Sequence, residues 1–128
     1  MTRSEVMARV RSKDTGPELA VRRAVHAAGF RYRLHRKTLP GTPDIVFPRT
    51  SVVVFINGCF WHGHNCRDGI RPASNTDYWD AKINRNIARD KRNVAALRRQ
   101  GWKVVVIQTC RLESGISRLL ALLRHRSQ

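Results

Sequence analysis

Acidic side chains are scarce in this chain of 128 residues, which has nine Asp and Glu against 25 Lys and Arg and a formal net charge of +16. An excess of one sign repels itself unless something anionic lies opposite, and nucleic acid is the usual partner of so basic a domain. The plain alternative is a ribosomal-type or merely soluble basic domain. The composition therefore indicates nucleic-acid binding, without saying which nucleic acid is bound.

Long apolar segments are also lacking. No run approaches the roughly 18 apolar residues of a membrane span. The start, MTRSEVMARVRSKDTGPE, has no apolar middle of the kind that a secretory signal peptide carries. We therefore expect no membrane partner and a cytoplasmic protein, nucleoid-associated when it is on DNA. The length suffices to bury a core without covalent staples, so residues 1–128 are interpreted as one domain.

Cysteine is rare, and its odd number of three argues against a disulfide framework. Two cysteines lie with two histidines in NGCFWHGHNC (57–66), a clustering that in a reducing compartment indicates a metal. The third cysteine follows a strand expected at 102–108. If that strand runs parallel to the one expected at 51–56, their carboxyl ends share one sheet edge and the third cysteine can reach the loop. The resulting Cys₃His ligand set is Cys59, His64, Cys66 and Cys110.

Four protein ligands leave no open position, which is typical of a structural zinc site. Such a site would stabilise a loop that has little regular hydrogen bonding of its own. The alternative is that the cysteines are ordinary small buried side chains. We expect one structural zinc ion, because a single place then uses every cysteine of the chain.

The N-terminal third predicts an arm, a helix and a strand. Residues 1–13 are interpreted as a basic N-terminal arm or short helix. Thr15-Gly-Pro-Glu18 has the pattern of a capping box, which predicts a helix from here to near Gly29. Residues 30–35 alternate apolar and basic side chains, as a half-exposed strand does.

The remaining segments predict a mixed sheet flanked by helices. Apolar runs at 44–47 and 51–56 predict two strands, and the second is apolar on both faces, as a central strand is. A long basic helix is expected at 79–100, then a buried strand at 102–108 and an amphipathic helix at 114–125. The order α-β-β-β-α-β-α belongs to the α/β class.

Asp44 and His62 are candidates for catalysis. A carboxylate at the start of a strand that faces phosphate is repelled by it, unless a divalent cation lies between them. Turn capping after Pro43 is the alternative for Asp44. His62 lies two residues before His64, where it is a candidate general base or else a spare or supporting zinc ligand.

Two further acids have ordinary explanations from the sequence alone. The capping box accounts for Glu18. Asp90 lies between Arg89 and Lys91 on the long helix, where ion pairing one turn away is the default interpretation.

Motifs along nearly the whole chain resemble those of the very-short-patch repair (Vsr) endonucleases, a family of DNA mismatch nicking enzymes. The GCFWH motif with its following ligands is highly specific, and the other segments occur in the family's order. These segments are RSEVMARVRSKDTGPE (3–18), LPGTPD (39–44), VFINGCFWHGHNC (54–66), DYWDAKINRNIARDKR (77–92) and GWKVVVIQTC (101–110).

The resemblance implies a fold and a reaction. The fold would be a restriction-endonuclease-like core of the PD-(D/E)XK type, and the reaction a magnesium-dependent nick beside a T:G mispair that arises when 5-methylcytosine deaminates. Asp44 looks like the aspartate that bridges two magnesium ions, with the backbone carbonyl of Ile56 as a further ligand. His62 looks like the residue that activates water, supported by Glu18 and Asp90.

The resemblance also implies the zinc site and the DNA contacts. The four residues named above match the family's structural zinc ligands. Phe60, Trp61 and Trp79 match aromatics that wedge between bases next to the mispair, and Met7 and Lys82 fall where family residues approach it. Inserting such wedges costs a few kcal/mol per base step, less at a weak pair.

The chain departs from the best-known family pattern before Gly58, where it has Ile56 and Asn57. A carbonyl ligand survives a change of side chain, and Asn57 can orient a water or a phosphate but cannot act as a base. Two alternatives therefore stay open: a related restriction or mobile-element nuclease that needs no mispair, and an inactive zinc-stabilised DNA-binding module. Because a nick on one strand needs only one active site, we expect a monomer.

Overall fold

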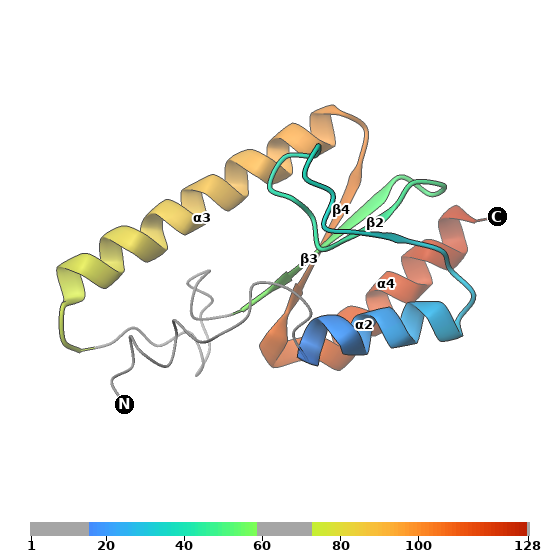
Figure 1. Ribbon diagram of the computed structural model, residues 1–128, viewed down its shortest axis with the longest axis horizontal. Helices are drawn as coiled ribbons and strands as arrows, with labels where there is room; N and C mark the ends of the chain where they lie inside the picture. The colour runs from blue at the N-terminus through green and yellow to red at the C-terminus, as the bar shows by residue number, and fades with distance from the viewer. Residues whose placement is uncertain (1–15, 59–72, 128) are drawn as a thin grey trace.

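The computed structural model describes residues 16–58 and 73–127, in which three α-helices and four strands form one α/β arrangement (Figure 1). None of the helices in these two segments is both long and apolar enough to cross a membrane. The elements are α2 (Gly16–Ala27), β1 (Arg33–Leu34), β2 (Ile45–Phe47), β3 (Val52–Asn57), α3 (Thr76–Arg99), β4 (Lys103–Gln108), the 3₁₀ turn η2 (Thr109–Arg111) and α4 (Leu112–Arg126).

The sheet is mixed, and its strand order is β1-β2-β3-β4. β1 and β2 are antiparallel, as are β2 and β3, whereas β3 and β4 are parallel. The β3–β4 register runs from Val52 opposite Lys103 to Asn57 opposite Gln108. The predicted mixed sheet is therefore confirmed. The parallel pairing that the zinc argument took as its condition is present, so the carboxyl ends of β3 and β4 share one edge.

Alternate side chains of the sheet supply two separate cores, because successive residues of a strand point to opposite faces. On one face, Val52 and Val54 pack with α2 and α4, which lie side by side (Figure 1). On the other face, Val53 packs with Leu97 near the carboxyl end of α3. Burial on both faces explains why β3 is apolar from Val52 to Ile56, as the sequence predicted for a central strand.

α3 is longer than the sheet face that it covers. Its 24 residues extend from the sheet toward the left of Figure 1, and only the carboxyl-terminal part packs on β4. The amino-terminal half buries a cluster of its own, formed by Trp79, Ile83 and Ile87.

The boundaries of several elements differ from those predicted. The strand expected at 30–35 is paired only at Arg33 and Leu34, and both are exposed at the sheet edge. Phe30 and Tyr32 pack against the core without joining the ladder, and His35 has a positive φ of 45°, which ends the strand. The two later helices begin at Thr76 and Leu112, two to three residues earlier than expected, a usual uncertainty at helix ends.

Candidate functional site

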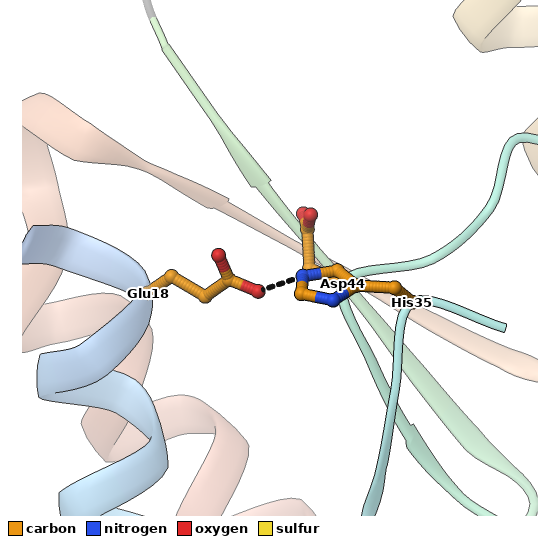
Figure 2. A group of neighbouring side chains, drawn as sticks. All are labelled: Glu18, His35 and Asp44. Atoms are coloured by element: carbon orange, nitrogen blue, oxygen red, sulfur yellow. Dashed lines mark hydrogen bonds and ion pairs between the residues drawn. The ribbon is translucent and has the colours of Figure 1, made fainter. Parts of the chain in front are cut away.

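The site lies at the sheet edge where β3 ends. β2 runs antiparallel to β3, so the residue that precedes β2 lies beside the carboxyl end of β3. That residue is Asp44, which follows the buried Pro43. Three chain segments meet here: the entry to β2, the end of β3 and the exit from β1, with the first turns of α2 beside them (Figure 2).

Asp44 is held to β3 through its backbone and its side chain. Its N–H donates to the carbonyl of Val54 at 3.0 Å. Its carboxylate oxygen Oδ2 accepts a hydrogen bond from the N–H of Ile56 at 2.7 Å. The side chain is therefore a fixed, half-buried carboxylate at the end of a strand and not a freely rotating one.

The carbonyl of Ile56 faces the same side of β3 as this carboxylate. Backbone groups along a strand repeat their direction every second residue. The Val54 carbonyl and the Ile56 N–H both point to the β2 side, because both bond to Asp44. The Ile56 carbonyl shares that direction. A carboxylate oxygen of Asp44 and the carbonyl oxygen of Ile56 therefore face the same side, where both could be metal ligands.

Glu18 is the buried acid of the site, with 2% of its surface exposed. It projects from the first turn of α2. Its Oε1 lies 3.0 Å from Arg22 Nη2, one turn along the same helix, and 2.5 Å from His35 Nε2. The capping box is thus an incomplete account of this residue, because its carboxylate joins the helix to the segment that leaves β1.

His35 is a candidate site residue that the sequence reasoning missed. Its backbone N–H donates to the carbonyl of Asp44 at 3.2 Å, and its ring bonds to Glu18. One potential ligand atom from each of Glu18, His35 and Asp44 lies within 4.8 Å of the others (Figure 2). The turn expected at 39–43 would place residue 38 opposite Asp44, whereas the observed register, with Leu34 opposite Ile45, places His35 there, so only the structure identified this residue.

The other predicted catalytic residues are placed as follows. Asn57 is the last residue of β3, half-buried and opposite Gln108 of β4. Asp90 lies on α3, which covers the other face of the sheet from α2, and it is not a member of the Glu18–His35–Asp44 group. Its supporting role stays a prediction. His62 lies outside the described residues.

The predicted DNA-contacting residues are described only in part. Trp79 is 4% exposed and meets the exposed Tyr78 edge to face, with 5.0 Å between ring centroids. Lys82 Nζ lies 5.8 Å from the Tyr78 ring centroid, a cation–π geometry. Their contacts with DNA stay predictions, and a wedging role for Trp79 would need its ring to become accessible. Phe60, Trp61 and Met7 fall outside the described residues.

Of the predicted zinc ligands, only Cys110 is described. It is exposed in η2, two residues beyond the carboxyl end of β4. Because β3 and β4 end in register, Cys110 emerges at the edge from which the chain continues toward residue 59. The predicted ligands Cys59, His64 and Cys66 lie outside the described residues, so the zinc site stays a prediction.

A basic surface follows one side of α3. Its residues line a shallow depression, and the three arginines among them are exposed. The lining residues are Lys82, Arg85, Asn86, Ala88, Arg89 and Arg92. A concentration of cations along one helix suits the regularly spaced charges of a phosphate backbone.

Comparison with known proteins adds independent findings. Residues 1–68 match the family described as DNA mismatch endonuclease Vsr. A Type II nicking enzyme of Xanthomonas oryzae, V.XorIIP, is 55% identical over 123 residues, covering 96% of this chain and 90% of its own. V.NmeAIP of Neisseria meningitidis is 47% identical over 112 residues, covering 88% and 80%. DNA mismatch endonuclease Vsr of Escherichia coli is 36% identical over 111 residues, covering 87% and 71%.

Proposed function

The chain belongs to the Vsr family of DNA mismatch endonucleases, and on this premise we propose that it nicks one strand of duplex DNA beside a T:G mispair left by deamination of 5-methylcytosine. Its membership of this family and its similarity to named nicking enzymes show that the chain is a DNA-nicking endonuclease. The observation that carries the proposal is Asp44, a carboxylate fixed to Ile56 at 2.7 Å.

The oxygen donors of this edge fit magnesium. Asp44 and the carbonyl of Ile56 face the same side of β3, and Mg²⁺ prefers carboxylate and carbonyl oxygen, keeping several waters. We assign these two groups as its protein ligands, with Asp44 shared between two ions. A bound cation would supply charge that offsets the negative charge developing on the phosphate under attack.

The chain's own side chains would orient and deprotonate the attacking water. His62 is proposed as the base, because imidazole exchanges a proton near neutral pH and this residue follows the end of β3 closely in sequence. Glu18, buried and 2.5 Å from His35, is proposed to support it. Asp90 is proposed to support His62 as well, and Asn57 is assigned an orienting role at most.

Zinc is proposed to hold the segment that follows β3. The ligands would be Cys59, His64, Cys66 and Cys110, and the position of Cys110 just past β4 supports the assignment. With four protein ligands the ion would be structural, stabilising the loop that carries His62.

Mispair recognition is assigned to aromatic wedges. Phe60 and Trp61 belong to the segment that the proposed zinc would fix. A segment held by zinc would resist deformation when these aromatic side chains insert between stacked bases. Trp79 is proposed as a third wedge once its ring is uncovered, with Met7 and Lys82 near the mispair. Separating the bases costs least at a weak pair, which by itself favours T:G over paired DNA.

Three broader assignments complete the proposal. The mixed sheet with helices on both faces supports a restriction-endonuclease-like core. A single domain over residues 1–128 and a monomer suit an enzyme that makes one nick with one active site. A cytoplasmic, nucleoid-associated protein suits a DNA substrate.

A second candidate is a nick at a particular sequence without any mispair. The names of the relatives favour it: the proteins 55% and 47% identical are called Type II nicking enzymes, whereas the protein called a mismatch endonuclease is 36% identical. An inactive DNA-binding module is a poorer interpretation, because the chain keeps Asp44 and the buried Glu18 together at one strand edge.

A nicking assay separates these functions. End-labelled duplexes that carry T:G, T:A or C:G at one position, in varied flanking sequence, are incubated with magnesium or with EDTA. The proposal expects nicking of T:G duplexes only, and only with magnesium. Equal rates on paired and mispaired duplexes would instead support the second candidate, and no nicking of any duplex would support the binding module.

A further inference from the structure

His35 is held in an unusual backbone conformation beside the two acids of the site. Its φ of 45° lies in the left-handed region, which few residues other than Gly adopt, although Asn, Asp and His adopt it more often than the rest. Such a conformation costs about 1–3 kcal/mol, and positions of this kind cluster at functional sites. The backbone bond to Asp44 and the ring contact with Glu18 fix the imidazole between a helix and a strand.

The distances suit one ion shared by three side chains. Ligands that surround an ion at about 2.0–2.2 Å lie roughly 3 Å apart when adjacent and about 4.3 Å apart when opposite. The three ligand atoms lie within 4.8 Å of one another, so small movements bring them to those separations. Glu18 Oε1 and His35 Nε2, now 2.5 Å apart, would need to part by about half an ångström.

The charges of the group also favour a cation. Glu18 and Asp44 bring two negative charges, and Arg22 beside Glu18 offsets one of them. Two carboxylates at one strand edge are the anionic oxygen ligands that divalent cations commonly take. The imidazole is a neutral nitrogen donor when it binds metal, so it adds a ligand without adding to this charge.

We propose that Glu18, His35 and Asp44 form one divalent-cation site in which His35 supplies a nitrogen ligand. The inference rests on the proposed function, because it concerns the same metal at Asp44. Mg²⁺ takes oxygen ligands, whereas imidazole suits Zn, Cu, Fe and Ni; Mn²⁺ also favours oxygen but belongs to the same transition-metal series and accepts a nitrogen ligand more readily than Mg²⁺ does. The site consequently binds Mn²⁺ more tightly, relative to Mg²⁺, than Asp44 and the carbonyl of Ile56 alone would.

The test uses Mn²⁺ as a paramagnetic probe, with the full chain, no DNA and no excess metal. Electron spin-echo spectra report ¹⁴N coupling when a nitrogen binds Mn²⁺. Titration of the free-Mn²⁺ signal gives its Kd, and competition gives that of Mg²⁺. The variant is His35→Asn, because Asn tolerates a positive φ and so preserves the backbone. The matched control is His26→Asn, at an exposed position on α2. Thermal melting checks that both variants fold.

The expected result is ¹⁴N coupling in the wild type and in His26→Asn but not in His35→Asn. The Kd for Mn²⁺ should rise about tenfold or more in His35→Asn, and the Kd for Mg²⁺ less than about threefold. Coupling that is absent from the wild type, or that persists in His35→Asn, would overturn the inference. So would equal weakening of both ions, because His35 would then act only by placing the carboxylates.

Failure of this inference can be told from failure of the proposed function. Magnesium-dependent nicking of T:G duplexes by a wild type that shows no nitrogen coupling would remove only His35 as a ligand. Coupling in a protein that nicks no duplex would keep the cation site and remove the nuclease function.

Discussion

At the scale of single residues, the site depends on where three side chains are fixed. Asp44 bonds to β3 through both its backbone and its carboxylate. Glu18 is buried on α2 and meets both Arg22 and His35. Burying a carboxylate is costly unless it is hydrogen-bonded, so these contacts are what allow the two acids to lie at this edge. Contacts within the chain therefore fix the positions of both carboxylates.

Replacing Asp44 should remove nicking and keep DNA binding. We expect Asp44→Ala to lower the nicking rate at least about a thousandfold, because it loses the proposed anchor for a charge-offsetting cation. Affinity for T:G duplex should be unchanged or higher, since a carboxylate that repels phosphate is gone. Single-turnover nicking and fluorescence anisotropy measure the two effects.

The control for this variant is Glu113→Ala, an exposed carboxylate in the first turn of α4. It should nick at the wild-type rate. Loss of DNA binding by Asp44→Ala would contradict a purely metal-holding role for the residue.

At the scale of elements, the edge formed by β3 and β4 depends on how closely α4 packs. α4 begins directly after η2, and its Gly115 faces β4. A Cβ built on Gly115 would come within 2.6 Å of Ile107 Cγ2, closer than side chains tolerate. Ile107 is fully buried in the core that α2 and α4 share with the sheet. The glycine therefore sets the spacing between this helix and the sheet.

Gly115→Ala should destabilise the fold. Although Ala is the better helix former, we expect a loss of about 1–3 kcal/mol in the free energy of unfolding, because overpacking forces the helix or Ile107 to move. Urea denaturation followed by circular dichroism measures it. Ser117→Ala, at an exposed position of the same helix, is the matched control and should have little effect. A stability equal to or above that of the wild type would show that the helix can shift freely.

Cys110→Ser tests the link between η2 and the segment that follows β3. We expect the bound zinc to fall well below one ion per chain and the melting temperature to fall with it, because the serine hydroxyl is a poor substitute for a thiolate ligand. Elemental analysis and thermal melting of the same samples measure both. Unchanged zinc content would exclude Cys110 from the ligand set.

At the scale of the whole molecule, the net charge of +16 is spread over several helices. α3 concentrates exposed arginines on one side, while α2 and α4 carry others on the opposite face of the sheet. Binding to DNA releases one counterion for nearly every phosphate that a cation neutralises, so the salt dependence of affinity counts the cations in contact. Measuring the salt dependence of DNA affinity in variants of each face can therefore show which face contacts DNA, without a structure of the complex.

A triple variant should show a weaker salt dependence of DNA affinity. In it, Gln replaces Arg85, Arg89 and Arg92. We expect the slope of log K against log salt concentration to fall by about 2 to 3, together with weaker binding, because each phosphate contact contributes about one unit. Anisotropy titrations of one labelled T:G duplex at several salt concentrations measure the slope.

The matched control removes the same charge elsewhere. Arg23, Arg118 and Arg124 are exposed on α2 and α4, and their triple replacement by Gln should change the slope by less than one. Equal slopes for the two triple variants would mean that the basic surface of α3 has no special part in binding.

Local patterns in the sequence determined much of this protein. The apolar runs at 44–47 and 51–56 predicted β2 and β3, because strands buried on both faces need unbroken apolar side chains. The strand at 102–108 was predicted as well, whereas its parallel pairing with β3 was only a condition that the fold then met. Asp44 and Glu18 were chosen as site residues, although their partners were not.

Only the tertiary structure decided which residues contact Glu18 and Asp44. The sequence explained Glu18 by a local capping box, whereas the fold brings it to His35, 17 residues away. The predicted strand 30–35 shortened to two residues because edge pairing competes with packing of Phe30 and Tyr32 on the core. The pattern of neighbouring residues predicts the secondary structure of a segment and which of its faces is buried. Which side chains meet across elements depends on register and packing, and these are properties of the whole fold.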